Sequence, residues 1–244
     1  MKHLKYAVYL SLVLGFLMAF QSCGNKKTTA LEKAYNMAVE AKDYTTATQL
    51  LTQWVCTDTT ISNWAYDSLS YYHYFYNASN PNVVRDPKTA MYYTDKGLKY
   101  NPKSNNLREL KAKLLLEQGK DTASLVLFRD LWQDTKENTY WWDMCFVEMA
   151  RGNILAADSM ITLALENPSA SKGEVRMEHI QARVKESVPS KAAYIYLQAL
   201  IFQSKNDIMG AATAYQAALK IFPNFYAARQ GIIDLQRMVS QQRR

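Results

Sequence analysis

The segment from Ala192 to Phe225 constrains the fold of this chain more than any other part. Its apolar residues recur at steps of three and four, first in Ala192–Ser204 and again in Ile208–Phe222, and this spacing predicts two amphipathic helices. Asn206 lies between the two helices, and asparagine tolerates the left-handed backbone with which many helices end. Pro223 closes the unit, because proline cannot continue a helix interior.

Weaker copies of this two-helix unit precede it. Each copy has two segments of helical apolar spacing, joined in most cases by a short turn, so each predicts a helix hairpin. Asp86-Pro87 is a typical helix start, with aspartate as the N-cap and proline in the first turn. The predicted hairpins are Ala30–Val55, Ile61–Tyr76 with Asp86–Asn101, Leu107–Gln118 with Ala123–Gln133, and Tyr140–Ala150 with Ile154–Glu166, and a terminal helix is predicted over Tyr226–Met238.

The last hairpin resembles a tetratricopeptide repeat, a helix–turn–helix unit of roughly 34 residues with fixed small, aromatic and proline positions. The resemblance implies an all-α fold, a right-handed superhelix of tetratricopeptide-like helix hairpins (an α-solenoid), over residues 30–239. It concerns packing positions and implies no catalytic chemistry. The matching residues are Ile195 at the family's Trp position, Ala199 at its small position, Phe202 at its Tyr position, and Ala211, Tyr215, Ala218 and Pro223 in the second helix, whereas Gln198 replaces the usual Leu.

The segment Glu174–Ser187 does not fit the repeat. Apolar residues are spaced so that they would share one face of a helix, namely Met177, Ile180, Val184 and Val188. We therefore expect a helix here that does not belong to the repeat and that interrupts the superhelix. Ser190 is expected to cap the helix that follows.

Residues 1–22 have the features of a secretory signal peptide. Lys2 and Lys5 supply the basic start, and Tyr6–Phe20 supplies an apolar run that is too short for a membrane span. The four residues that end at Cys23 (FQSC) resemble the lipoprotein box of Bacteroidetes, and this resemblance implies that Cys23 is acylated and becomes the mature N-terminus. The alternative is an ordinary signal peptide that is cut nearby, with Cys23 incidental.

Residues 23–29 are then expected to form a lipidated tether in front of the repeat domain at residues 30–239. The surface-export signals of Bacteroidetes lipoproteins are acidic just after the cysteine, whereas Lys26 and Lys27 are basic. The resemblance therefore implies a lipid anchor in the bacterial outer membrane, with the protein facing the periplasm. Such an anchor would make the membrane one partner of the chain.

The charge of the chain does not favour nucleic-acid binding. The formal net charge is +7, about +5 without Lys2 and Lys5, and the basic residues are scattered along the chain. The sequence also has no GxSxG, HExxH, CxxC, phosphate-loop or dinucleotide motif, and His73 and His179 lack metal-ligand spacing. We therefore expect no enzyme activity, no cofactor, no metal ion and no nucleic-acid partner.

Two further cysteines, Cys56 and Cys145, lie in the first and fourth predicted hairpins. A disulfide needs Cα atoms within about 7 Å, and a repeat in a solenoid contacts only its neighbours. We therefore expect no bridge, and interpret both cysteines as small buried residues.

Aromatic residues make up 12% of the chain, and several fall where the first helix of each hairpin would line a concave groove. A helix face opposite the packed face should be polar if it meets only water, whereas these positions are largely apolar. They form a candidate partner-binding groove, in which tryptophan and tyrosine would be the anchors. The alternative is that a neighbouring segment covers them as part of the core. The residues are Leu69, Tyr72, Trp142, Phe146, Met149, Tyr196, Leu200 and Gln203.

These features predict a cell-envelope lipoprotein that acts as a scaffold or assembly factor and binds a protein or peptide partner in its groove. The alternative is a glycan-binding lipoprotein with an aromatic platform.

The sequence also resembles the Bacteroidetes O-glycosylation motif at Thr59 and Thr122, each preceded by aspartate and expected in a turn. Ser68 and Ser159 match the same motif but are expected on helices.

Overall fold

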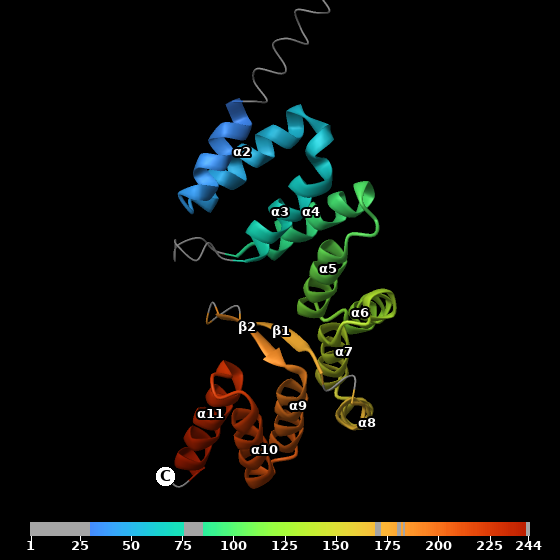
Figure 1. Ribbon diagram of the computed structural model, residues 1–244, viewed down its shortest axis with the longest axis vertical. Helices are drawn as coiled ribbons and strands as arrows, with labels where there is room; N and C mark the ends of the chain where they lie inside the picture. The colour runs from blue at the N-terminus through green and yellow to red at the C-terminus, as the bar shows by residue number, and fades with distance from the viewer. Residues whose placement is uncertain (1–29, 76–84, 169–171, 180–181, 183, 243–244) are drawn as a thin grey trace, which may run out of the picture. The chain divides into compact units, whose positions relative to one another are not determined.

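The computed structural model describes residues 30–75, 85–168, 172–179, 182 and 184–242 (Figure 1). The chain forms two compact units, Met1–Leu107 and Arg108–Arg244. The predicted signal peptide (residues 1–22), tether (23–29) and acylated Cys23 lie outside the described residues, and their assignments stay predictions.

The first unit consists of packed helices, as the apolar spacing predicts. Residues 30–40 are helical, and they are followed by α2 (Tyr44–Thr57), a 3-10 turn η1 (Thr59–Ile61), α3 (Ser62–Tyr74) and α4 (Pro87–Tyr100). Helix α2 packs on α3, and α3 packs on α4. The predicted start at Asp86-Pro87 is confirmed, because the Asp86 carboxylate accepts the Thr89 backbone N–H at 3.0 Å and Pro87 occupies the first turn.

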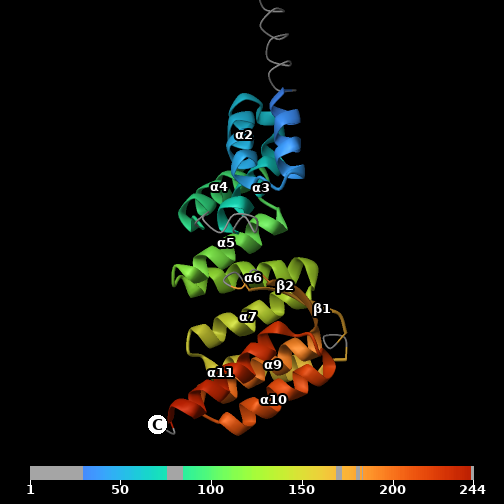
Figure 2. The ribbon, with the colours of Figure 1, turned by 90° about the vertical axis from the view of Figure 1, so that its left-hand side faces the viewer.

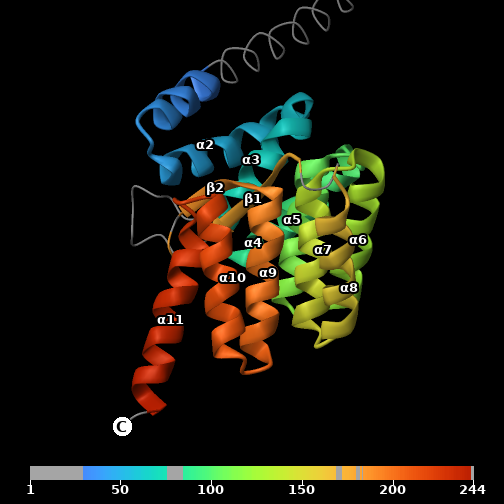
Figure 3. The same cartoon turned by 60° about the horizontal axis from the view of Figure 1, so that its bottom comes forward.

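In the second unit each helix from α6 to α10 packs on the next one along the chain, which is the contact pattern of a helical repeat. Figure 2 shows α6, α7 and α9 in this order, and Figure 3 shows α9, α10 and α11 side by side. The unit contains most of α5 (Asn105–Glu117), then α6 (Asp121–Thr135), α7 (Asn138–Ala150), α8 (Ile154–Glu166), α9 (Ser190–Ser204), α10 (Ile208–Ile221) and α11 (Tyr226–Gln242).

A β-hairpin, not a helix, lies between α8 and α9. Strand β1 (Glu174–His179) pairs antiparallel with β2 (Val184–Pro189), and Val175 lies opposite Val188. Alternate residues of β1, Val175 and Met177, are buried, which is the two-residue period of a half-buried strand. The predicted helix over Glu174–Ser187 is therefore wrong.

The start of α9 also differs from the prediction. Pro189 is the N-cap residue, and its side chain makes no capping hydrogen bond. The Ser190 hydroxyl is buried and accepts a hydrogen bond from Asn138 Nδ2 at 2.9 Å, so it joins α9 to α7 instead of capping its own helix.

Small residues make the helix contacts of the last hairpin possible. Ala199, Ala211 and Ala218 have no exposed surface and belong to one apolar cluster with Tyr215 and Phe225. Alanine lets two helix backbones approach closely, so these three packing positions and that of Tyr215 are confirmed. Phe202, at the family's Tyr position, is instead 36% exposed.

The two cysteines differ in environment. Both thiols are free, as predicted, and Cys145 is buried, but Cys56 is exposed near the end of α2. The interpretation of Cys56 as a buried residue is therefore wrong, because the apolar side chains of α2 face the other side of the helix.

Candidate functional site

Two aromatic residues on α7, Trp142 and Phe146, form a stacked pair in the predicted groove. The Trp142 and Phe146 rings stack with centroids 5.5 Å apart and planes 9° apart. The Trp142 indole N–H donates to the Ala193 backbone oxygen at 3.2 Å, which fixes the ring against α9. Phe146 is 38% exposed, so one of its surfaces is available to a partner while Trp142 supports the other.

Of the residues of α9 predicted to line the groove, Tyr196 is part of the apolar core. Tyr196 packs against Tyr215 and Phe225, with ring centroids at 5.8 and 5.2 Å. Burial, and to a smaller degree the carboxylates of Glu186 and Asp234, raise the pKa of Tyr196 to about 12. Tyr196 is thus mainly a packing residue.

Leu200, Gln203 and Met149 are partly buried. Leu200 packs against the cluster that contains Tyr215 and Phe225, whereas Met149 packs against the cluster shared by α7, α8 and α9. The Gln203 side-chain oxygen accepts the Tyr215 hydroxyl at 2.8 Å, so the amide is oriented by α10. Met149 belongs to α7, the helix of Phe146, and Leu200 and Gln203 belong to α9, which contacts α7 directly.

In the first unit the two predicted groove residues are packed. Leu69 has no exposed surface and belongs to the core between α2 and α3, so it cannot contact a partner. The Tyr72 hydroxyl shares a hydrogen bond with the Tyr35 hydroxyl at 3.0 Å, and burial, followed by that hydrogen bond, raises the pKa of Tyr72. Leu69 is therefore a core residue, and most of the Tyr72 side chain is also packed in the core and not in a groove.

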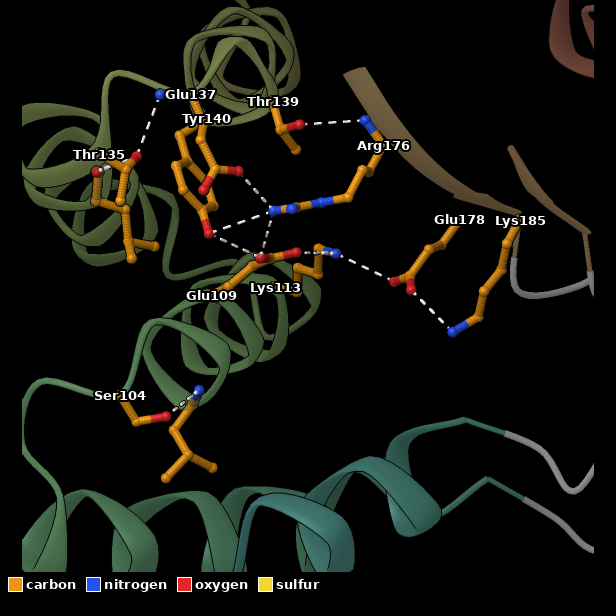
Figure 4. A network of polar contacts seen from close by, with 12 residues as sticks. Ser104, Glu109, Lys113, Thr135, Glu137, Thr139, Tyr140, Arg176, Glu178 and Lys185 are labelled. Atoms are coloured by element: carbon orange, nitrogen blue, oxygen red, sulfur yellow. Dashed lines mark hydrogen bonds and ion pairs between the residues drawn. The ribbon is translucent and has the colours of Figure 1, made fainter. Parts of the chain in front are cut away.

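Sequence reasoning missed a network of charged side chains between α5, α7 and the hairpin (Figure 4). Lys113 Nζ lies 2.8 Å from a Glu109 carboxylate oxygen and 3.1 Å from a Glu178 oxygen. The Tyr140 hydroxyl donates to Glu109 at 3.1 Å, and an Arg176 guanidinium nitrogen lies 3.6 Å from Glu109. The network therefore ties β1 to α5 and α7.

Two more contacts complete this attachment of β1. Arg176 pairs with Glu137 at 2.9 Å, and its backbone N–H donates to the Thr139 hydroxyl at 3.1 Å. The only signal of the network in the sequence is the Glu109–Lys113 spacing of four, which predicts a pair on one helix but not its partners from other elements.

The network shifts the pKa values of its members in opposite directions. Burial raises the pKa of the Asp143 carboxyl to about 7, because the Lys113 ammonium offsets only part of the loss of water. Burial also acts on Glu109, but the charges of Lys113 and Arg176 outweigh it and lower the pKa of that carboxyl. One oxygen of Asp143 is buried without a hydrogen-bond partner among the described residues.

The remaining site predictions fare differently. Thr59 is exposed in η1, whereas Thr122, predicted in a turn, is an exposed residue in the first turn of α6. Within the described ranges no three His, Cys, Asp or Glu side chains gather as a metal site. In the same part of the chain, every helix is too short or too polar to cross a bilayer.

The sequence matches no protein-family model and no curated protein. Among solved structures, it is similar to a tetratricopeptide repeat protein from Parabacteroides merdae, with a TM-score of 0.52 and 15% identity over 86% of this chain and 71% of the other. It is similar to PilW, described as a type IV pilus biogenesis factor, with a TM-score of 0.52 and 14% identity over 84% and 82% of the two chains.

A third similar structure is YrrB, described as a tetratricopeptide repeat protein with an unusual peptide-binding site, with a TM-score of 0.50 and 13% identity over 80% and 87% of the two chains. At these identities the similarity concerns the fold and not the function. The chain therefore has the tetratricopeptide repeat fold, a helical-repeat solenoid with one inserted β-hairpin.

Proposed function

We propose that this chain is a cell-envelope lipoprotein that acts as a protein-binding scaffold or assembly factor. A lipid on Cys23 would anchor it in the outer membrane, facing the periplasm, and a segment of a partner protein would bind beside Phe146. The support for the anchor is the signal-like stretch that ends at Cys23. The support for the binding role is the geometry around Phe146.

The observation that carries the binding role is the stacked pair of Trp142 and Phe146. Binding energy concentrates in a few aromatic side chains that are rigid before the partner arrives, because little side-chain entropy is then lost. Trp142 is fixed by its hydrogen bond to Ala193 and by stacking, and Phe146 is partly exposed above it. Met149, Leu200 and Gln203 are partly buried on the same two helices and would supply the mixed apolar and polar rim of such an interface.

Two of the similar structures support the same class of function. YrrB is described with an unusual peptide-binding site, and PilW is described as a type IV pilus biogenesis factor. Both descriptions concern those proteins, and they extend to this chain only as part of the proposal.

The test is recovery of a partner from detergent-solubilised envelope with the full chain as bait. Phe146→Ala should reduce recovery of a stoichiometric protein by about tenfold or more, the effect of losing an aromatic anchor. Phe202→Ala is the matched control, because Phe202 is 36% exposed on α9 and lies outside the predicted groove. Equal recovery with both variants would contradict the role of Phe146.

The anchor is tested separately. Cys23→Ser should abolish labelling by a palmitate analogue and move the protein from the detergent phase to the aqueous phase. A wild-type chain without lipid at residue 23 would refute this half of the proposal.

The alternative, a glycan-binding lipoprotein, would use the exposed tyrosines of α4, Tyr92 and Tyr100, as its platform. A glycan array with the full chain, and with Tyr92→Ala, tests it. We favour a protein partner, because Lys96 lies over the Tyr92 ring and Lys99 precedes Tyr100, and neither lysine has an ion pair with another described residue.

A further inference from the structure

Helices α3 and α4 approach closely at Gly97, and this contact builds a tyrosine cluster. A Cβ atom at Gly97 would lie 2.9 Å from the Tyr66 Cβ, so only glycine admits Tyr66 here without a shift. Tyr93 and Tyr100 lie four residues before and three after Gly97, on the same face of α4. Tyr66 therefore stacks between them, with ring centroids 6.2 Å from Tyr93 and 5.5 Å from Tyr100.

The cluster extends to the surface through residues that are about half exposed. Tyr92 is 55% exposed and Tyr100 51% exposed, and Tyr92 packs edge-on against Tyr93 at 5.3 Å. The Lys96 ammonium lies 5.5 Å from the centre of the Tyr92 ring, and Lys99 is exposed one residue before Tyr100. These six residues (Tyr66, Tyr92, Tyr93, Tyr100, Lys96 and Lys99) form what we call the tyrosine–lysine patch.

The patch contains hydrogen-bond donors without acceptors. Among the described residues, none of its four phenol hydroxyls makes a hydrogen bond, and neither ammonium has an ion pair. The pKa of the Tyr66 hydroxyl is raised, mainly by burial and to a smaller degree by neighbouring tyrosine hydroxyls. The Tyr66 hydroxyl therefore stays protonated and can donate a hydrogen bond at neutral pH. Helix α4 carries Lys88, Lys96 and Lys99 against one carboxylate, Asp95, which has an interaction of its own.

A ligand that matches this patch must carry hydrogen-bond acceptors and negative charge, and it must also pack against aromatic rings. Carboxylates on an extended peptide meet these needs, since charge-assisted hydrogen bonds from Lys and Tyr to carboxylates are the strong ones. Tyrosine is also a favoured anchor residue in protein interfaces. We propose that the tyrosine–lysine patch binds an acidic segment of the partner protein, an inference that rests on the proposed scaffold function and assigns it a second contact.

The test uses the full chain in detergent and a fluorescein-labelled deca-glutamate as the probe, followed by fluorescence anisotropy. Binding is expected at about 50 mM salt and should weaken at about 300 mM, because salt screens exposed charges. Lys96→Gln with Lys99→Gln should weaken binding about tenfold. Tyr92→Phe with Tyr100→Phe keeps the rings, removes two hydroxyls and should weaken binding several-fold.

The matched control is Lys33→Gln with Lys220→Gln, which removes the same charge from exposed positions outside the patch. An equal loss with this control would mean non-specific attraction and would overturn the proposal. If oligogalacturonate displaces deca-glutamate as well as unlabelled deca-glutamate does, the ligand is not specifically a peptide. Binding of the chain to vesicles with anionic lipid as tightly as to deca-glutamate would also overturn the choice of a peptide.

Failure of this inference can be separated from failure of the proposed function. Phe146→Ala should leave deca-glutamate binding unchanged, because Phe146 is not part of the patch. If Phe146→Ala loses the envelope partner but the wild-type chain does not bind deca-glutamate, the scaffold function is supported. The same result overturns the proposal that the tyrosine–lysine patch binds an acidic segment.

Discussion

The buried carboxyl of Asp143 should make the stability of the second unit depend on pH. Its pKa rises from the usual 3.8 to about 7 in the folded chain, mainly because burial disfavours the charged form. The groups that face it are Lys113 and Glu109 on α5 and Arg176 and Glu178 on β1. At about 1.4 kcal/mol for each tenfold change in acid dissociation, this rise corresponds to about 4 kcal/mol.

The sign follows from the direction of the shift. An acid whose folded pKa lies above its unfolded pKa destabilises the fold only when it is ionised. For Asp143 the penalty is absent below pH 3.8, grows as the pH rises, and is complete above about pH 7. The free energy of unfolding should therefore lose about 4 kcal/mol over this range from this one group.

Asp143→Asn isolates the effect, since the amide has nearly the same shape and cannot ionise. The amide leaves a polar group unpaired, which costs about 1–3 kcal/mol at every pH. Lys113 keeps Glu109 and Glu178 as partners in the variant. The variant should thus be less stable than wild type at pH 4 and more stable at pH 8, with the difference changing by about 4 kcal/mol.

The assay is urea unfolding of both proteins between pH 4 and pH 8, followed by circular dichroism. Subtracting the free energy of unfolding of the wild type from that of the variant at each pH removes the contribution of all other groups whose pKa values are unaffected. A difference that stays constant within about 1 kcal/mol across this range would refute the reasoning, because Asp143 would then have the same pKa in the folded and unfolded chains.

Two other substitutions test single contacts. Gly97→Ala should destabilise the first unit by about 1–3 kcal/mol in chemical denaturation, because a Cβ would lie 2.5 Å from Leu107 Cδ1 and 2.9 Å from Tyr66 Cβ; an unchanged midpoint would mean that α3 and α4 are not in close contact. Glu186→Ala should lower the stability of the second unit by about 1–2 kcal/mol, since Glu186 accepts the Tyr226 backbone N–H at 3.0 Å and pairs with His179 at 2.7 Å. Glu174→Ala is its control, because the Glu174 carboxylate lies at the exposed end of β1 and accepts only the exposed Ser187 hydroxyl among the described residues.

The helical repeat was predictable because its packing is local. Ala199, Ala211 and Ala218 recur at positions where two helices of one hairpin meet, and a hairpin needs only about 34 residues to show them. Helix ends were predictable for a similar reason, since the Asp86 cap bonds to Thr89, three residues away. The terminal helix continues to Gln242, past the predicted end at Met238, because no breaking residue follows Met238.

The hairpin was mispredicted because its apolar residues fit two periods at once. Met177 and Val184 are spaced for one helix face, but Val175 and Met177 also alternate, and the strand period is the one that the structure uses. Gly173 has a φ of 99°, which favours glycine and suits a change of chain direction before the strand. A glycine followed by the alternating apolar residues Val175 and Met177 is the signal that favours a strand.

The candidate site was predictable only in part. Spacing on α7 places Trp142 and Phe146 on one face, and both lie there, but it cannot show that Leu69 is covered by another helix. The charged network joins Lys113 to Glu178, 65 residues later in the chain, and such a contact depends on the tertiary fold. Spacing within one helix therefore identified the aromatic pair and missed the network.

The inserted hairpin should make the second unit more cooperative than a simple solenoid. In a solenoid each repeat contacts only its neighbours, so distant helices unfold with little coupling. Here the hairpin contacts α5 through Glu178 and Lys113, α7 through Arg176 and Thr139, and α11 through Glu186, which accepts the Tyr226 N–H. One insertion thus links helices that do not follow one another.

Val188→Ala tests this coupling, because Val188 has no exposed surface and lies in the core shared by the hairpin, α9 and α10. Loss of its two methyl groups should destabilise the unit by about 2 kcal/mol, from lost apolar burial and the cavity left behind. Hydrogen exchange should then accelerate in α5 and in α11 together, although neither contains the substitution. Leu163→Ala, on the exposed face of α8, is the control and should change neither helix. Faster exchange confined to the hairpin and α9 would show that the insertion is a local addition and that the unit unfolds repeat by repeat.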